Sequence, residues 1–268
     1  QDKNNVFERE NMSETIINIE QLSFSYGEQN VLTQLNMAIK KGKITTLIGA
    51  NGCGKSTLLN IITKNLKPYS GSIFINGQEI SDIKLKDFAR NVAIVHQYNT
   101  APSDITVETL VSYGRIPYKK LGEFYNKEDE EKIKWALEVT NTYKYKDRAL
   151  SELSGGQKQR VWIAMALAQD TKLLLLDEPT TYLDIRYQLQ ILKLVKMLNQ
   201  EYGFTVVMVL HDINQSLYYS DEIVALKNGK VLVQGEPEKV ITSETVKQVY
   251  DIDLKLSTVD GKPYVIAV

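Results

Sequence analysis

Short apolar runs alternate along the chain with longer stretches of helical spacing. Runs typical of strands occur at residues 16–19, 44–48, 73–75, 92–95, 173–176, 205–210, 223–226 and 230–234. Strands separated by helical stretches favour an α/β fold with a mixed sheet. The early runs have the spacing of hairpins, so we expect them to form an antiparallel sub-sheet at one edge.

The middle of the chain has a different pattern. From about residue 104 to residue 168 most segments have helical spacing rather than the alternation of strands. In the helix predicted at the end of this stretch, four apolar residues fall on one face, namely Val161, Ala164, Met165 and Ala168. This pattern predicts a helical subdomain, at about residues 98–170, inserted into the α/β core.

The two ends of the chain differ from the part between them. Residues 1–11 are polar and have no periodicity, and regular alternation begins only after Met12. We interpret this leader either as a frayed terminus or as a remnant that precedes the native start. Residues 251–268 have the pattern of a strand hairpin with an Asp-Gly turn. The domain predicted between these ends covers residues 12–250.

Composition and charge exclude several classes of protein. The chain has 268 residues, of which 43% are apolar, so it is long enough to bury a substantial core. Its 32 basic and 33 acidic residues nearly balance, so we expect no nucleic-acid partner. No apolar run reaches the roughly 18 residues that span a bilayer, and no secretory signal opens the chain. Cys53 is the single cysteine, which is consistent with a reducing, cytoplasmic compartment.

The segment Gly-Ala-Asn-Gly-Cys-Gly-Lys-Ser-Thr at 49–57 matches the phosphate-loop pattern G-x-x-x-x-G-K-[ST]. It follows a predicted strand and precedes a helix-compatible run. Glycines let the backbone wrap phosphate groups, and the following helix directs its positive end at them. A glycine-rich turn that only starts a helix is the alternative. We predict an ATP site at Gly49, Asn51, Gly52, Cys53, Gly54, Lys55, Ser56 and Thr57.

Two of these residues have specific expected roles. Lys55 should reach the β- and γ-phosphates, because its positive ammonium group is attracted to their negative charge. Ser56 should place its hydroxyl on Mg²⁺, which prefers oxygen ligands and neutralises the triphosphate.

A second segment places two acidic residues directly after an apolar strand. Asp177 and Glu178 follow the run at 173–176, and ligands of α/β sheets bind at such strand ends. Asp177 is the expected ligand of Mg²⁺, and Glu178 should orient or deprotonate the attacking water. Alone, this segment would be an ordinary strand end. Together with the phosphate loop it predicts phosphoryl-transfer chemistry.

The segment Leu-Ser-Gly-Gly-Gln at 153–157 opens a predicted helix, and here the chain resembles the ABC ATPase family. The resemblance extends from about residue 17 to residue 240. In that family two subunits pack head to tail, and this segment of each serves the γ-phosphate held by the other. Free helix-start amides and glycines suit an anion site. The resemblance therefore implies a second copy as partner and a nucleotide-contacting role for Ser154, Gly155, Gly156 and Gln157.

Two further matches concern the nucleotide base and the subunit interface. Tyr26 matches the aromatic residue that stacks on adenine; the alternative is a tyrosine that packs within a strand. Asp184, in a Leu-Asp pair, matches the loop that crosses the interface between the subunits; the alternative is an aspartate in a buried turn.

Two matches concern catalysis. Gln97 matches the glutamine that senses Mg²⁺ and the attacking water and that links the helical subdomain to the sheet. His211 matches the histidine that contacts the γ-phosphate, while His96 has no matching role. The resemblance thus implies Glu178, His211 and Gln97 as catalytic residues, with Ser56, Gln97 and Asp177 around the metal.

The segment Gly-Arg-Ile-Pro at 114–117 resembles the Gly-Arg-x-Pro segment of ATPases that serve iron–siderophore, haem and cobalamin importers. The C-terminal hairpin pattern resembles the ending of the same subgroup. A histidine commonly follows the proline there, whereas this chain has Tyr118.

These resemblances imply the ATP-hydrolysing subunit of an importer for an iron chelate, such as a siderophore or haem. The chain would work at the cytoplasmic face of the membrane, bound to a separate permease, with an extracellular binding protein acting indirectly. We expect the permease to contact Tyr113, Ile116, Pro117 or Tyr118, although core packing would also explain them. The alternatives are an exporter ATPase and an ABC ATPase without a transporter. The second lacks support, because the chain has neither a second cassette nor a long coiled coil.

Overall fold

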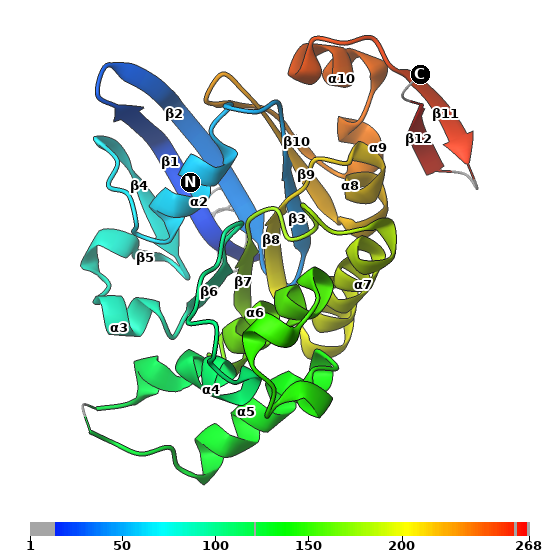
Figure 1. The fold of residues 1–268 in the computed structure, drawn as a ribbon. Helices are drawn as coiled ribbons and strands as arrows, with labels where there is room; N and C mark the ends of the chain where they lie inside the picture. Colours follow the sequence, from blue (N-terminus) through cyan, green and yellow to red (C-terminus); the bar gives the residue numbers. More distant parts are fainter. Residues whose placement is uncertain (1–13, 121, 260–261, 267–268) are drawn as a thin grey trace. The chain divides into compact units, whose positions relative to one another are not determined.

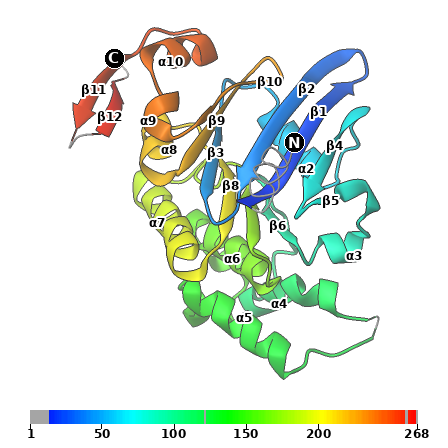
Figure 2. The same cartoon turned by 180° about the vertical axis from the view of Figure 1, so that it is seen from behind.

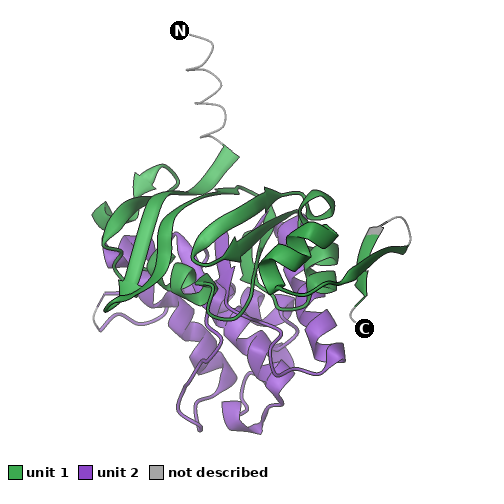
Figure 3. Cartoon of the chain, turned by 90° about the horizontal axis from the view of Figure 1, so that it is seen from above, with its two compact units in different colours: residues 1–83, 205–268 green, residues 84–204 purple. Residues whose placement is uncertain are grey.

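The computed structural model describes residues 14–120, 122–259 and 262–266, and the chain divides into two units (Figure 3). The first unit comprises residues 1–83 and 205–268, and the second comprises residues 84–204. The predicted leader and the predicted Asp-Gly turn lie outside the described residues. Among the helices of the described ranges, none is both long and apolar enough to span a bilayer.

Four strands of the first unit form an antiparallel sheet in the order β2-β1-β4-β5 (Figure 1). They are β1 (Thr15–Tyr26), β2 (Gln29–Lys40), β4 (Ser70–Ile75) and β5 (Gln78–Glu79). This confirms the predicted antiparallel sub-sheet, but β2 is missing from the predicted strands. Gln34 has a left-handed backbone (φ 47°), and the pairing with β1 shifts register several times. These irregularities interrupt the alternation that sequence analysis relies on.

The other strands of the first unit position the phosphate loop. They are β3 (Ile44–Ile48), β8 (Thr205–Val209), β9 (Glu222–Lys227) and β10 (Lys230–Gly235). β3 pairs in parallel with both β8 and β9, and β10 is antiparallel to β9. All five residues of β3 are buried, including the two polar residues Thr45 and Thr46. The phosphate loop therefore begins at the carboxyl end of a strand that is held on both sides.

The helices of the first unit are α2 (Lys55–Ile62), the 3-10 helix η1 (Ile80–Asp82), α8 (Ile213–Tyr219), α9 (Pro237–Val240) and α10 (Ser243–Tyr250). α9 and α10 pack on β9, and their apolar residues share a buried cluster with Ile48 and Ala225. The final strands β11 (Lys255–Val259) and β12 (Lys262–Ile266) pair antiparallel, and β12 lies against α8 (Figure 2). The C-terminal part of the chain thus packs on the strands that carry the phosphate loop.

In the second unit, β6 (Val92–Val95) pairs in parallel with β7 (Leu173–Leu176). Its helices are α3 (Leu85–Phe88), α4 (Val107–Ser112), η2 (Tyr113–Tyr118), α5 (Lys127–Val139), η3 (Tyr143–Tyr145), η4 (Leu150–Glu152), α6 (Gly155–Ala168) and α7 (Ile185–Tyr202). The helical pattern expected from residue 104 onward is confirmed. The expectation of a single apolar face for α6 is too narrow, because Trp162, Ile163 and Leu167 are buried as well. This helix packs against α4, α5, α7 and β6, so it is covered on several sides.

Candidate active site

The backbone of the phosphate loop requires glycine at two positions. A Cβ on Gly49 would lie 2.5 Å from the Leu226 carbonyl oxygen and 2.6 Å from the Cys53 sulfur. Gly54 has a left-handed backbone (φ 106°), and a Cβ there would lie 2.6 Å from Leu32 Cδ2. Both contacts are closer than a side chain tolerates. The loop is therefore pressed against β9 on one side and β2 on the other, and its shape is fixed.

Lys55 is folded into the loop. Its side chain is only 5% exposed, and Nζ donates hydrogen bonds to the carbonyl oxygens of Gly49 (2.7 Å) and Ala50 (3.0 Å). Gly54 precedes α2 without a side-chain cap, so the first amides of this helix have no acceptor within the helix. A buried ammonium beside such amides fits a phosphate group in charge and in hydrogen bonding. Ser56 is the second residue of the same helix and carries the hydroxyl expected at Mg²⁺.

His211 and Tyr26 lie in the same unit as the loop. His211 is exposed and follows β8, and Leu210 N donates to Leu47 O (3.4 Å), so β3 and β8 end at the same edge. Asp212, the next residue, caps α8 by accepting a hydrogen bond from the Gln215 amide (2.9 Å). The ring of Tyr26 packs edge-on against Phe24, yet 52% of the residue is exposed. One side of this ring therefore stays open to a ligand.

The two predicted catalytic residues of the second unit are in contact. β6 and β7 run parallel in register, and the Asp177 amide donates to Val95 O (2.9 Å). Gln97 and Glu178 each stand two residues beyond their strand, and Gln97 Nε2 donates to Glu178 Oε2 (2.5 Å). Thr181 Oγ1 donates to the same oxygen (3.0 Å). Two donors thus fix the carboxylate of Glu178, whose backbone has a left-handed φ of 51°.

The start of α6 is a capping box formed by the predicted nucleotide-contacting segment. The Ser154 amide donates to Gln157 Oε1 (2.8 Å), and the Gln157 amide donates to Ser154 Oγ (3.4 Å). Ser154 and Gly155 are exposed, whereas Gly156 is buried. A Cβ on Gly156 would lie 2.3 Å from the ring of Tyr187, so this position admits only glycine. The box satisfies the amides of Ser154 and Gln157, which leaves those of the two glycines directed outward from the helix start.

Asp184 is exposed and not in a buried turn, and it caps α7. Its Oδ1 accepts a hydrogen bond from the Tyr187 amide (3.1 Å). Two residues earlier, Tyr182 shares a hydrogen bond between hydroxyl groups with Tyr98 (2.8 Å), the residue after Gln97. This contact has no signal in the sequence, because the two tyrosines belong to no common motif and are far apart in the chain.

The first two residues of the Gly-Arg-Ile-Pro segment face inward. A Cβ on Gly114 would lie 2.2 Å from the Met165 carbonyl oxygen in α6. Arg115 is 2% exposed, and its guanidinium donates to Asp129 Oδ1 (2.9 Å) and to the Ala168 carbonyl oxygen (2.9 Å). These two residues anchor the segment to α5 and α6.

The four expected permease contacts fall into two groups. Tyr118 is half-buried, and its hydroxyl donates a hydrogen bond to the Gln169 carbonyl oxygen (2.9 Å). The Arg115 guanidinium lies over the Tyr118 ring, with Arg115 Cζ 4.0 Å from the ring centre. Tyr118 therefore contributes to packing within the second unit. Pro117 is also half-buried and contributes in part to the same packing. Tyr113 and Ile116 are 44% and 58% exposed and remain the candidates for a partner contact.

The ion pair under this segment should control the stability of the second unit. Burial alone would raise the pKa of the Asp129 carboxyl, but hydrogen bonds from Lys119, the Asn126 amide and Arg115 together lower it. We expect Asp129→Asn to lower the free energy of unfolding by about 3 kcal/mol, because it leaves the buried Arg115 charge unpaired. Urea unfolding at pH 7 measures this loss.

The pH dependence of the same experiment follows from the lowered pKa. The stabilisation is complete above the ordinary aspartate value of 3.8 and is lost as the pH falls through the lowered value, so the two proteins should converge only in strong acid. The control is Asp147→Asn, since Asp147 is 80% exposed and pairs with Lys146 at the surface. An equal loss in both variants would contradict the assignment.

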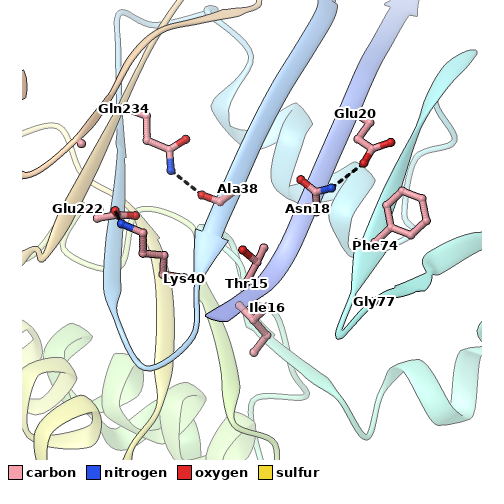
Figure 4. Close-up of a pocket in the computed structure, with 11 residues that line it drawn as sticks. Thr15, Ile16, Asn18, Glu20, Ala38, Lys40, Phe74, Gly77, Glu222 and Gln234 are labelled. Carbon is pink, nitrogen blue, oxygen red and sulfur yellow. Dashed lines mark hydrogen bonds and ion pairs between the residues drawn. The ribbon is translucent and has the colours of Figure 1, made fainter. Parts of the chain in front are cut away.

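A separate groove of about 840 Å³ lies in the first unit (Figure 4). Its walls come from β1, β2, β4, β9 and β10, and Lys40 Nζ contacts Glu222 Oε1 (2.5 Å) within it. The hydrogen bond and charge of Glu222 raise the pKa of Lys40. None of the predicted site residues lines this groove, and it has no glycine-rich loop, so its chemistry does not match a triphosphate.

The chain is similar to known proteins over most of its length. The family model described as ABC transporter matches residues 32–181. The iron(3+)-hydroxamate import ATP-binding protein FhuC of Bacillus subtilis (strain 168) is 49% identical over 242 residues, covering 90% of each protein. The ferric enterobactin transport ATP-binding protein FepC of Escherichia coli (strain K12) is 40% identical over 259 residues, covering 95% of this chain and 96% of the relative.

Solved structures show the same architecture. The ADP conformation of MJ1267, an ATP-binding cassette of an ABC transporter, has a TM-score of 0.80 at 27% identity and covers 88% of this chain and 98% of its own. The dimeric post-hydrolysis state of the cassette MJ0796, bound to ADP and Pi, has a TM-score of 0.71 at 30% identity and covers 83% of this chain and 99% of its own.

Proposed function

This chain belongs to the ABC transporter family, and from that membership we propose that it is the ATPase subunit that powers uptake of an iron chelate through a separate permease. The observation that carries the proposal is its similarity over almost its whole length to subunits named for ferric hydroxamate and ferric enterobactin transport. The inward-facing Gly114 and Arg115 support it, since they give the subgroup segment a structural role in this chain.

We assign phosphate binding to the loop at residues 49–57. Lys55 Nζ now bonds to the Gly49 and Ala50 carbonyl oxygens, and it would exchange these for phosphate oxygens, which carry more negative charge. Ser56 and Asp177 offer the hydroxyl and carboxylate oxygens that Mg²⁺ prefers, and the ion would neutralise triphosphate charge. The half-exposed ring of Tyr26 would stack on adenine.

We assign the general base to Glu178. Its Oε2 accepts hydrogen bonds from Gln97 and Thr181, and these donors hold the carboxylate where it would accept a proton from water. Gln97 would contact the same water and the metal through its amide, and His211 would donate a hydrogen bond to the γ-phosphate. Their positions at the ends of parallel strands support these roles.

We further propose that two copies of the chain work head to tail. Ser154, Gly155, Gly156 and Gln157 at the start of α6 would serve the nucleotide of the other copy, and Asp184 would lie at the interface. The exposure of Ser154, Gly155 and Asp184, and the dimeric state of the solved relative, support this arrangement. Tyr113 and Ile116 would contact the permease at the cytoplasmic face of the membrane.

Transport by the native complex tests the proposal. The tagged chain is purified with its permease from membranes of its own cells and reconstituted in vesicles with the ATPase side outward. The permease then transports out of the lumen whatever it imports into the cell. With ⁵⁵Fe-hydroxamate and binding protein inside, ATP should drive iron outward, and Glu178→Gln should lower this flux by about 100-fold. ATP-driven movement in the opposite direction would instead support an exporter.

A further inference from the structure

The C-terminal end of α10 lies against the phosphate loop, although it belongs to no sequence motif. Val249 and Asp251 line a cavity of about 110 Å³ together with residues 50–53 of the loop and residues 227–228. Val249 also shares a buried cluster with Ile48, the residue directly before the loop. The last turn of α10 therefore lies beside the loop and shares a buried cluster with the residue that precedes it.

Tyr250, the final residue of α10, brings a buried hydroxyl to this contact. Its oxygen is shielded from solvent and has no hydrogen-bond partner of standard geometry within the described ranges. Burial raises the pKa of this phenol to about 12; the Gly49 backbone lowers the pKa, and Cys53 raises it. Both loop residues are thus close enough to act on the hydroxyl. The hydroxyl therefore lies at the loop backbone, where Gly49 is its hydrogen-bonding neighbour although the geometry is not standard.

Lys227 links the same helix end to the loop by a second route. Its Nζ donates to the Gln248 carbonyl oxygen and to Asp251 Oδ1 (2.6 Å), which fixes the last turn of α10. Two residues later, the Gly229 amide donates to the Cys53 carbonyl oxygen (3.2 Å). A continuous set of contacts therefore connects α10, the turn between β9 and β10, and the loop.

We propose that Tyr250, supported by Lys227, is a positioning residue that holds the phosphate loop in its nucleotide-receiving shape. The proposal rests on the assignment of phosphate binding to this loop. When the ammonium group of Lys55 binds phosphate, it no longer donates hydrogen bonds to the Gly49 and Ala50 carbonyl oxygens, and these bonds no longer hold the loop closed. Contacts at Gly49 and Cys53 then keep the backbone in place. Such support acts on the preorganisation of the binding site and not on the chemical step.

Nucleotide binding and turnover, measured together, test this role. Tyr250→Phe removes the hydroxyl and keeps the ring, Tyr250→Ala removes both, and Lys227→Met removes the second link. We expect the Kd for mant-ATP to rise about 3-fold in Tyr250→Phe and Lys227→Met and about 10-fold in Tyr250→Ala. The KM for ATP should rise in parallel, and kcat should stay within about 2-fold. The exposed Lys230→Met is the matched control, with Kd unchanged.

The outcomes separate a positioning role from a purely structural one. Lower melting temperatures with an unchanged Kd in Tyr250→Phe and Lys227→Met would overturn the proposal, as would a fall in kcat with KM unchanged. If Tyr250→Ala fails to fold, these two milder variants decide. If the wild-type chain binds no mant-ATP, the assignment of phosphate binding to the loop itself fails. If the wild-type chain binds mant-ATP and the variants bind it equally well, only the role of Tyr250 and Lys227 fails.

Discussion

Replacing Glu178 by glutamine is expected to lower ATP hydrolysis by about 100-fold or more while nucleotide binding persists. Glutamine has nearly the same shape, and its carbonyl oxygen still accepts the hydrogen bonds from Gln97 and Thr181. It cannot accept a proton from the attacking water. Phosphate release measures the loss, and mant-ATP binding shows that the nucleotide is still held.

The same variant should accumulate as an ATP-bound dimer, because the step that releases the two copies is blocked. Size-exclusion chromatography with ATP and Mg²⁺ detects this species. Glu152→Gln is the matched control, since Glu152 is about half exposed and pairs with Arg148 at the surface (2.9 Å). A Glu178→Gln protein that stays monomeric and keeps its turnover would remove Glu178 from the mechanism.

A mixture of two inactive variants should regain activity. Lys55→Ala removes the buried ammonium from the phosphate loop, and Ser154→Arg places a bulky side chain at the exposed start of α6. In a head-to-tail pair each site combines Lys55 of one copy with Ser154 of the other. A mixed dimer therefore has one site with both defects and one intact site.

Each variant alone is expected to lose about 100-fold or more of the wild-type turnover. An equimolar mixture in the permease-bound complex should recover up to about a quarter of it, because half of the dimers are mixed and each has one intact site. Native mass spectrometry verifies that mixed dimers form. Mixed dimers no more active than either parent would show that the two segments do not act across an interface.

The features that local sequence could predict are those built from contiguous residues. Three segments are of this kind: the phosphate loop, the Asp-Glu pair after β7 and the segment that opens α6. In each, the end of a strand or the start of a helix and the side chains expected to act there lie within a few consecutive residues. Even there the sequence did not predict the capping role of Asp184. It also did not predict that Ser154 and Gln157 satisfy each other's amides.

The features that could not be predicted depend on residues far apart in the chain. Arg115 meets Asp129, and Tyr98 meets Tyr182, only after the helices and loops have packed. Tyr118 is a residue type that is common at partner contacts, but its hydroxyl binds the Gln169 carbonyl oxygen and its ring packs against Arg115. Tyr250 reaches the phosphate loop because α10 packs on β9, a pairing that no periodicity records.

ATP turnover by the purified wild-type chain, with and without Mg²⁺ and beside Glu178→Gln, tests the central claim most directly. The account predicts Mg²⁺-dependent phosphate release that exceeds that of the variant by about 100-fold or more. A wild-type chain that releases no phosphate, or a variant that releases it at the wild-type rate, would contradict the assignment of this chain as an ATP-hydrolysing subunit.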